Sequence, residues 1–180
     1  MWLDAAKTSP FEFYQFWFNT EDESVEEYLL KMTLMPKAHI EEVMAAQNAD
    51  PASRAAQKML AYEVTKLVHG EDIANGCQKS PEILYSKDTQ DISVDEVEVL
   101  RAIRAPMARV ASGDSMIDVL VSSLVASSKR EARQFLDDGA ITLNGEKITD
   151  AARALIDADF YNDIALLKRG RRVVVVLSRI

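Results

Sequence analysis

The side chains best suited to chemistry in this sequence are positively charged and gather in its C-terminal part. Lys129, Arg130 and Arg133 occupy positions i, i+1 and i+4 of a segment whose apolar residues recur at helical spacing. Their charges therefore project from one surface close to the start of a helix. Ammonium groups, guanidinium groups and the positively polarised start of a helix all favour phosphate oxygens. This arrangement predicts a surface that binds the phosphates of RNA.

A second basic cluster lies in a predicted turn and would extend the first. Its members are Lys168, Arg169, Arg171 and Arg172. The alternative is that Arg133 pairs with Asp137, one helical turn away, and that the other charges only keep the protein soluble. The sequence leaves both interpretations open.

Little else in the sequence suits catalysis or metal binding. The two histidines, His39 and His69, are isolated in helical contexts, and Cys77 has no Cys-x-x-Cys partner. The six glycines form no phosphate-binding loop. The acidic residues of 21–27 and 41–42 are typical of a solvated helix face. We therefore predict no catalytic residue, no metal site and no cofactor in this chain.

The charge is distributed unevenly along the chain, which carries a net charge of −8. Residues 1–100 hold 8 Lys or Arg against 19 Asp or Glu, and residues 101–180 hold 13 against 10. This asymmetry is compatible with an RNA-binding unit beside an acidic neighbour, and equally with two solvated surfaces. No apolar run approaches the roughly 20 residues of a membrane helix, and a single cysteine cannot form an internal disulfide. We expect no membrane association and a reducing compartment.

The first half of the sequence predicts a bundle of helices. Ser9, Pro10 and Glu12 fit an N-cap, a first-turn proline and the acidic member of a capping box. Aromatic residues then recur at helical spacing, as expected of a buried face. Ser24 and Glu27 repeat the capping box and predict the start of a second helix.

Two more helices follow in the predicted bundle. Pro36 opens the third, and Asp50 and Pro51 open the fourth and longest. The fourth is predicted to end at His69, because Gly70 can adopt the left-handed conformation that closes a helix.

Three regions follow from these patterns. Residues 1–85 are predicted to be all helical. Residues 86–110 are mostly polar and aperiodic, apart from a candidate short helix at 94–104, and we interpret them as a linker. Residues 111–180 predict a small α+β domain with two helices and about four strands, so the chain as a whole belongs to the α+β class.

The small domain begins with its two predicted helices. The apolar face of the first comprises Ile117, Leu120, Val121 and Leu124, and the second begins after Ser128, which forms a capping box with Glu131.

Two turns then predict hairpins. Asn144 and Gly145 are the commonest residues of a tight two-residue turn, and residues 168–172 form the other. The apolar run at 173–176 predicts a strand that is buried on both faces or an edge strand covered by a neighbour.

Three segments resemble known families. Residues 127–145, SSKREARQFLDDGAITLNG, are similar to the signature of the RNA-binding fold named after small-subunit ribosomal protein S four. Residues 7–19, KTSPFEFYQFWFN, and 54–70, RAAQKMLAYEVTKLVHG, resemble the helical anticodon-binding region of bacterial and organellar tyrosyl-tRNA synthetases. Together, in this order, the resemblance spans nearly the whole chain.

The resemblance implies a binding partner, tRNA(Tyr). It places Lys129, Arg130 and Arg133 on RNA. It also makes Asp22 a candidate for reading an anticodon base edge, since a carboxylate accepts hydrogen bonds from a base amino group. The alternative for Asp22 is an acid at the start of a helix.

The resemblance also implies what the complete enzyme does, namely ATP-dependent ligation of tyrosine to tRNA. Its ATP- and Mg-binding catalytic domain carries His-x-Gly-His and Lys-Met-Ser-Lys-Ser type motifs, and neither occurs in these 180 residues. We therefore expect the chain alone to be inactive and monomeric, the complete enzyme to dimerise through that domain, and both to be cytoplasmic or in the mitochondrial matrix. The rival functions are a stand-alone RNA-binding regulator with the S four-type fold and a helical protein-interaction scaffold.

Overall fold

The computed structural model describes residues 1–86, 89–170 and 173–180. These residues form two compact units. The first comprises Met1–Pro81 with Ala102–Arg104, and the second comprises Glu82–Arg101 with Ala105–Ile180.

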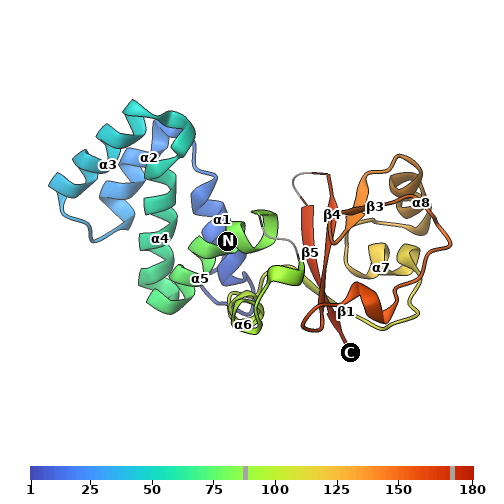
Figure 1. Ribbon diagram of the computed structural model, residues 1–180. Helices are drawn as coiled ribbons and strands as arrows, with labels where there is room; N and C mark the ends of the chain where they lie inside the picture. The colour runs from blue at the N-terminus through green and yellow to red at the C-terminus, as the bar shows by residue number, and fades with distance from the viewer. Residues whose placement is uncertain (87–88, 171–172) are drawn as a thin grey trace. The chain divides into compact units, whose positions relative to one another are not determined.

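The first unit is a helical bundle built around its longest helix. Its helices are α1 (Pro10–Phe18), α2 (Asp22–Met32), α3 (Lys37–Ala49), α4 (Ala55–His69) and α5 (Glu71–Pro81). The other four all pack against α4, which runs through the middle of this unit (Figure 1). Phe13, Leu29, Ile40 and Leu60 meet in its core, so the predicted bundle is confirmed.

The start of α1 follows the sequence prediction, whereas the start of α2 does not. The Ser9 hydroxyl accepts a hydrogen bond from the Glu12 amide, and the Glu12 carboxylate accepts one from the Ser9 amide, which completes the capping box. Helix α2 begins at Asp22, so Ser24 lies within its first turn and caps nothing. The predicted capping box of Ser24 and Glu27 is wrong because the helix already begins two residues before Ser24, and Glu27 pairs instead with Lys31.

The fourth helix begins later than predicted. Pro51–Ser53 form a short 3₁₀ turn, η1, and Arg54 adopts a left-handed conformation with φ of 53° before α4 starts at Ala55. The Arg54 guanidinium donates to the Phe18 carbonyl at 2.8 Å, and this long-range contact stabilises the break. The predicted end at Gly70 is confirmed, but Gly70 has φ of 92° and ψ of 163° and so does not adopt the left-handed helical conformation. Helix α5 follows directly and was not predicted.

The second unit combines three helices with one sheet. Its helices and strands are α6 (Val94–Ala102), β1 (Met107–Val110), α7 (Met116–Ser122), α8 (Lys129–Asp137), β2 (Ile141–Leu143), β3 (Glu146–Ile148), β4 (Ile164–Arg169) and β5 (Val173–Arg179). Short helical turns lie at η2 (Glu82–Ser86), η3 (Thr89–Asp91) and η4 (Asp157–Asp159). The α+β class predicted from the sequence is confirmed.

The sheet has one more strand than predicted. Its order is β1-β5-β4-β2-β3, in which β1 runs parallel to β5 and every other pair is antiparallel. Strand β1 lies within the predicted linker, so that segment contains helix α6 and an edge strand of the sheet. Strand β1 was not predicted, because it forms only by pairing with β5 at the far end of the chain, where Met107 lies opposite Val176.

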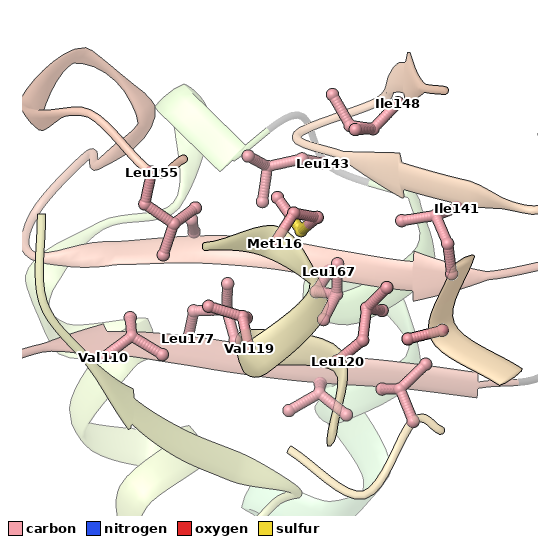
Figure 2. Close-up of a cluster of buried hydrophobic side chains, with 14 of the residues drawn as sticks. Val110, Met116, Val119, Leu120, Ile141, Leu143, Ile148, Leu155, Leu167 and Leu177 are labelled. Atoms are coloured by element: carbon pink, nitrogen blue, oxygen red, sulfur yellow. The ribbon is translucent and has the colours of Figure 1, made fainter. Parts of the chain in front are cut away.

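Helices α7 and α8 cover one face of this sheet (Figure 1), and Figure 2 shows Leu120 of α7 beside Leu167 and Leu177 of the sheet. Leu120 of α7 and Leu136 of α8 meet Leu167 and Leu177 of the sheet in one buried cluster. Val175 and Leu177 of β5 face this cluster, and Val174 and Val176 on the opposite face of the strand are also buried. Of the two alternatives for residues 173–176, the strand buried on both faces is therefore confirmed.

Two local predictions in this unit have opposite outcomes. Asn144 and Gly145 have φ of 51° and 86° and join β2 to β3, so the predicted hairpin is confirmed. Leu124 does not lie on the apolar face of α7, because that helix ends at Ser122 and the Ala126 amide donates to the Leu120 carbonyl to close it. The chain then turns so that Val125 enters the core in its place.

No helix among residues 1–86, 89–170 and 173–180 is long and apolar enough to cross a membrane.

Candidate nucleic-acid interface

The start of α8 is fixed by hydrogen bonds from side chains. The Ser128 hydroxyl accepts from the Glu131 amide at 3.2 Å, which confirms Ser128 as the N-cap. The Glu131 carboxylate accepts from both the hydroxyl and the amide of Ser127 at 2.6 Å, so Ser127 replaces Ser128 in the second half of the predicted capping box. These bonds lower the pKa of Glu131. The first turn of α8 is therefore held in place by these hydrogen bonds.

The three predicted phosphate ligands on α8 lie together and are exposed. Lys129 and Arg130 lie in the first turn, and Arg133 follows one turn later. Lys129 Nζ lies 2.6 Å from Asp118 Oδ1 of α7, and both side chains are more than half exposed. Hydrogen bonding to Lys129 lowers the pKa of Asp118. Part of the charge of Lys129 is thus already neutralised, while Arg130 projects into solvent.

The alternative pairing for Arg133 is not formed. Both Arg133 and Asp137 are described by the structure, and no ion pair joins them. Arg133 instead lies close enough to Asp118 to contribute to the lowered pKa of that carboxyl group. Lys129 and Arg133 therefore share one carboxylate neighbour, Asp118.

The two described members of the second predicted basic cluster, Lys168 and Arg169, lie on opposite faces of the sheet. The guanidinium of Arg169 lies 4.7 Å from the centre of the Phe135 ring of α8, and its Nη1 donates to the Val125 carbonyl at 2.6 Å. Lys168 Nζ lies 5.9 Å from the ring centre of Tyr85. Neighbouring residues of a strand face opposite sides of a sheet, so Lys168 and Arg169 do not form one patch. The other two members, Arg171 and Arg172, lie outside the described residues.

Asp22, the candidate residue for reading an anticodon base edge, lies in the first unit. It is the first residue of α2, and its carboxylate accepts a hydrogen bond from the Gln57 amide of α4. It also lines a hollow of about 500 Å³ with Asn19, Thr20, Glu21, Pro51, Ala52 and Arg54. The contact with Gln57 could not be predicted, because it joins residues from different helices.

An apolar hollow on α1 and α2 was also missed by the sequence analysis. Its volume is about 620 Å³, and its lining includes Phe16, Trp17, Tyr28 and Met32. The Trp17 ring makes edge-to-face contacts with Phe16 and Tyr28, with ring centres 5.3 and 5.7 Å apart. Phe16 is 56% exposed and lies outside the predicted buried stripe. That stripe comprises Phe11, Tyr14, Trp17 and Phe18, of which Tyr14 is buried and the others are half-buried.

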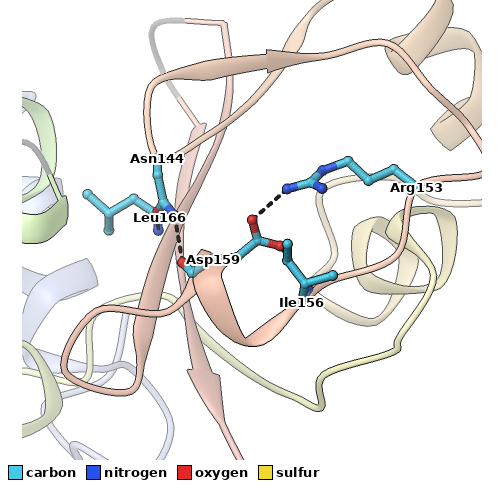
Figure 3. Close-up of polar contacts among 5 residues, drawn as sticks. All are labelled: Asn144, Arg153, Ile156, Asp159 and Leu166. Carbon is cyan, nitrogen blue, oxygen red and sulfur yellow. Dashed lines mark hydrogen bonds and ion pairs between the residues drawn. The ribbon is translucent and has the colours of Figure 1, made fainter.

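A polar hollow in the second unit has a structural explanation. Its volume is about 720 Å³, and Asn144, Arg153 and Asp159 are among its lining residues. Asn144 donates to the Asp159 carbonyl at 2.6 Å and accepts from the Leu166 amide at 2.9 Å (Figure 3). The Asp159 carboxylate binds Arg153 and accepts from the Ile156 amide. Both carboxylate oxygens of Asp159 are therefore engaged in contacts that hold this part of the chain together.

The first unit contains a buried cysteine, Cys77, and a half-buried histidine, His69. Burial raises the pKa of the Cys77 thiol to about 12, so a thiolate nucleophile does not form near neutral pH. Burial also lowers the pKa of His69, which packs edge-to-face on Phe13 with ring centres 4.9 Å apart. Both groups therefore have structural roles.

Comparisons with known proteins agree with the resemblance found in the sequence. A family model described as the SYY-like C-terminal domain of tyrosine–tRNA ligase matches residues 96–177, and one for class I tRNA synthetases (W and Y) matches residues 1–86. The chain belongs to the tyrosyl-tRNA synthetase family. The first match includes β1 and α8, so the basic surface lies within the C-terminal domain of the synthetase family.

Named relatives of this synthetase chain match almost all of it. Tyrosine–tRNA ligase 2 of Enterococcus faecalis is 39% identical over 182 residues, which cover 99% of this chain and 43% of the relative. A tyrosine–tRNA ligase of Clostridium botulinum (strain Eklund 17B / Type B) is 37% identical over 172 residues, which cover 96% and 40%. The chain therefore spans about two fifths of the length of these relatives.

A solved structure matches a smaller part of this synthetase chain. A C-terminally truncated mitochondrial tyrosyl-tRNA synthetase of Aspergillus nidulans is 44% identical and covers 47% of this chain and 25% of its own, with a TM-score of 0.46.

Proposed function

We propose that this chain binds tRNA(Tyr) as the RNA-recognising C-terminal region of a tyrosine–tRNA ligase. The observation that carries the proposal is the exposed group of Lys129, Arg130 and Arg133 at the start of α8. Guanidinium forks and a helix start together suit phosphate oxygens, and RNA helices are recognised largely through their backbone and shape. This surface would contact the anticodon stem and the variable arm.

The helical unit would approach the anticodon. Unpaired bases stack on aromatic side chains, and the hollow containing Phe16, Trp17 and Tyr28 supplies such surfaces. Asp22, at the neighbouring hollow, would accept from a base amino group. Its carboxylate already accepts from Gln57, which would hold it in place for this contact.

The complete enzyme would activate tyrosine with ATP and Mg²⁺ and transfer it to tRNA, while this chain supplies recognition. We expect the complete enzyme to be a homodimer through its catalytic domain, the chain alone to be monomeric, and both to work in the cytoplasm or the mitochondrial matrix. The chain alone should not catalyse tyrosine-dependent exchange of pyrophosphate into ATP. Exchange above background at enzymatic rates would contradict this division of roles.

Competition binding tests the proposed partner. Labelled tRNA(Tyr) is bound to the chain and challenged with unlabelled tRNA(Tyr) or with bulk tRNA lacking it. We expect tRNA(Tyr) to compete far better. Equal competition would indicate a general RNA-binding regulator, and failure to bind either would favour the protein-interaction scaffold.

The basic surface is tested by changing Lys129, Arg130 and Arg133 together to alanine. Each lost phosphate contact should reduce the slope of log affinity against log salt by about 0.7 to 0.9, so the triple variant should lose about two in slope and bind more weakly at low salt. Among the single alanine variants, the change of Lys129 should reduce the salt slope least, because Asp118 already pairs with Lys129.

A matched control variant changes Lys31, Lys37 and Lys79, three exposed lysines of the first unit, to alanine. This control removes three positive charges, as the α8 variant does, and should keep the wild-type slope of log affinity against log salt. An unchanged slope in the α8 variant, with an unchanged melting temperature, would assign its cations to solubility alone.

A further inference from the structure

Leu124 is held in a conformation that leucine rarely adopts. It lies in the connection between α7 and α8 with φ of 60°. Its side chain is 90% exposed, the highest exposed fraction among the large apolar residues that the structure describes. The left-handed conformation crowds a Cβ atom, and an exposed leucine recovers none of that cost through burial. This position is therefore unfavourable within the isolated chain.

The other non-glycine residues with positive φ have a compensating contact. Within the described part of the chain, each of the other five makes a tertiary hydrogen bond or ion pair through its side chain. These residues are Arg54, Arg104, Asn144, Asn162 and Asp163. Asparagine and aspartate also tolerate the left-handed region better than other residues do. Leu124 is the exception, because its apolar side chain points into solvent.

The connection that carries Leu124 is firmly anchored. The Leu124 amide donates to the Val121 carbonyl, and the next residue, Val125, is buried. The Val125 carbonyl accepts from Arg169, and the ion pair between Lys129 and Asp118 joins the two helices that flank the connection. Leu124 is thus presented in one position, five residues before Lys129.

We propose that Leu124 is a further RNA-contact residue, which packs on a ribose or an unstacked base next to the phosphates bound by α8. The proposal rests on the proposed function, because it places Leu124 on the same RNA face. Cations hold the sugar–phosphate backbone, and an apolar side chain beside them excludes water from the nucleotide. The contact involves no charge, so it adds affinity without adding salt dependence.

Two substitutions separate the side chain from the backbone strain. Leu124→Ala removes the apolar contact and keeps a Cβ atom in the strained conformation. Leu124→Gly removes both, and glycine adopts this conformation without strain. Leu34→Ala is the matched control, because Leu34 is 85% exposed and belongs to the other unit. Binding of labelled tRNA(Tyr) to the full chain is measured across a salt series, beside thermal melting of each variant.

We expect both Leu124 variants to bind tRNA(Tyr) about fivefold more weakly, the effect of uncovering roughly half of a leucine side chain. The salt slope should equal that of the wild type, and the Leu34 control should bind normally. Leu124→Gly should melt no lower than the wild type, which excludes unfolding as the cause. Wild-type affinity in Leu124→Ala, or a loss accompanied by a reduced slope, would overturn the proposal. If the wild type itself fails to bind tRNA(Tyr), the proposed function fails and this contact with it.

Discussion

Changing Arg169 to alanine should reduce stability far more than it reduces RNA binding. The sequence made Arg169 a candidate phosphate ligand, but in the structure its guanidinium lies 4.7 Å from the centre of the Phe135 ring and donates to the Val125 carbonyl at 2.6 Å. These contacts tie the end of β4 to α8 and to the connection before it. Arg169 is therefore expected to act mainly as a support for the RNA face.

The size of the effect follows from these two contacts. A hydrogen bond from a charged donor contributes about 1.5 kcal/mol at the low end of its range, and a partly exposed cation–π contact contributes about 0.5 to 1 kcal/mol. The loss is increased because the carbonyl of Val125, a residue only 2% exposed, would lack its partner. The total is about 2 kcal/mol. In a unit of roughly 100 residues, this corresponds to a fall in melting temperature of about 10 °C.

The assay combines thermal melting with tRNA(Tyr) binding across a salt series. Arg169→Lys is the matched control, because it keeps the charge but loses the planar fork that stacks on Phe135 and bonds the carbonyl. We expect Arg169→Ala to melt about 10 °C lower with an unchanged salt slope, and Arg169→Lys to show an intermediate loss of stability. A slope reduced by about 0.7 to 0.9 with an unchanged melting temperature would refute this reasoning and make Arg169 a phosphate ligand.

Three further predictions concern the first unit and the boundary between the units. Burial lowers the pKa of His69 from its ordinary value of 6.5, so the unfolded chain binds a proton more readily than the folded chain. The contribution of neutral His69 to stability should therefore be complete above about pH 7.5 and should decrease as the pH falls through 6.5. Thermal melting between pH 8 and pH 5 should show this decrease, and the His69→Gln variant should lack it. Cys77, with its thiol pKa raised to about 12, should not react with a disulfide reagent at pH 8 until the chain is unfolded in guanidinium, and rapid native reaction would contradict its burial. Limited proteolysis should cut first within residues 82–93, near the boundary of the two units, whereas a first cut inside β1 would be inconsistent with its pairing to β5.

Features set by neighbouring residues were predictable from the sequence. The capping box of Ser9 and Glu12, the end of α4 at Gly70 and the Asn144–Gly145 turn each depend on contacts within a few residues. The cations of α8 were placed on one surface for the same reason, since helical periodicity alone determines which residues share a face.

Features set by distant residues were not predictable. The late start of α4 depends on Arg54 reaching carbonyl groups after α1, and β1 forms only because β5 offers it an edge. The contact of Asp22 with Gln57 is likewise between different helices.

The division between Lys168 and Arg169 is a different case, because the sequence held the necessary signal. Both residues belong to a strand, and side chains alternate between the faces of a strand with a period of two. The prediction of a single turn over residues 168–172 did not take this alternation into account. The strand in fact continues to Arg169, so the two side chains point to opposite faces.

The position of β5 in the sheet determines when the second unit can fold. Strand β5 lies between β1 and β4, although it is made of residues 173–179, which the ribosome synthesises after every other strand of the sheet. Until they emerge, β1 has no partner and β4 lacks one of its two neighbours. The helical unit, whose contacts are closer in sequence, can fold while synthesis continues. We therefore expect the acidic, helical unit of a nascent chain to be compact while the second unit is still open, with two strand edges exposed to chaperones.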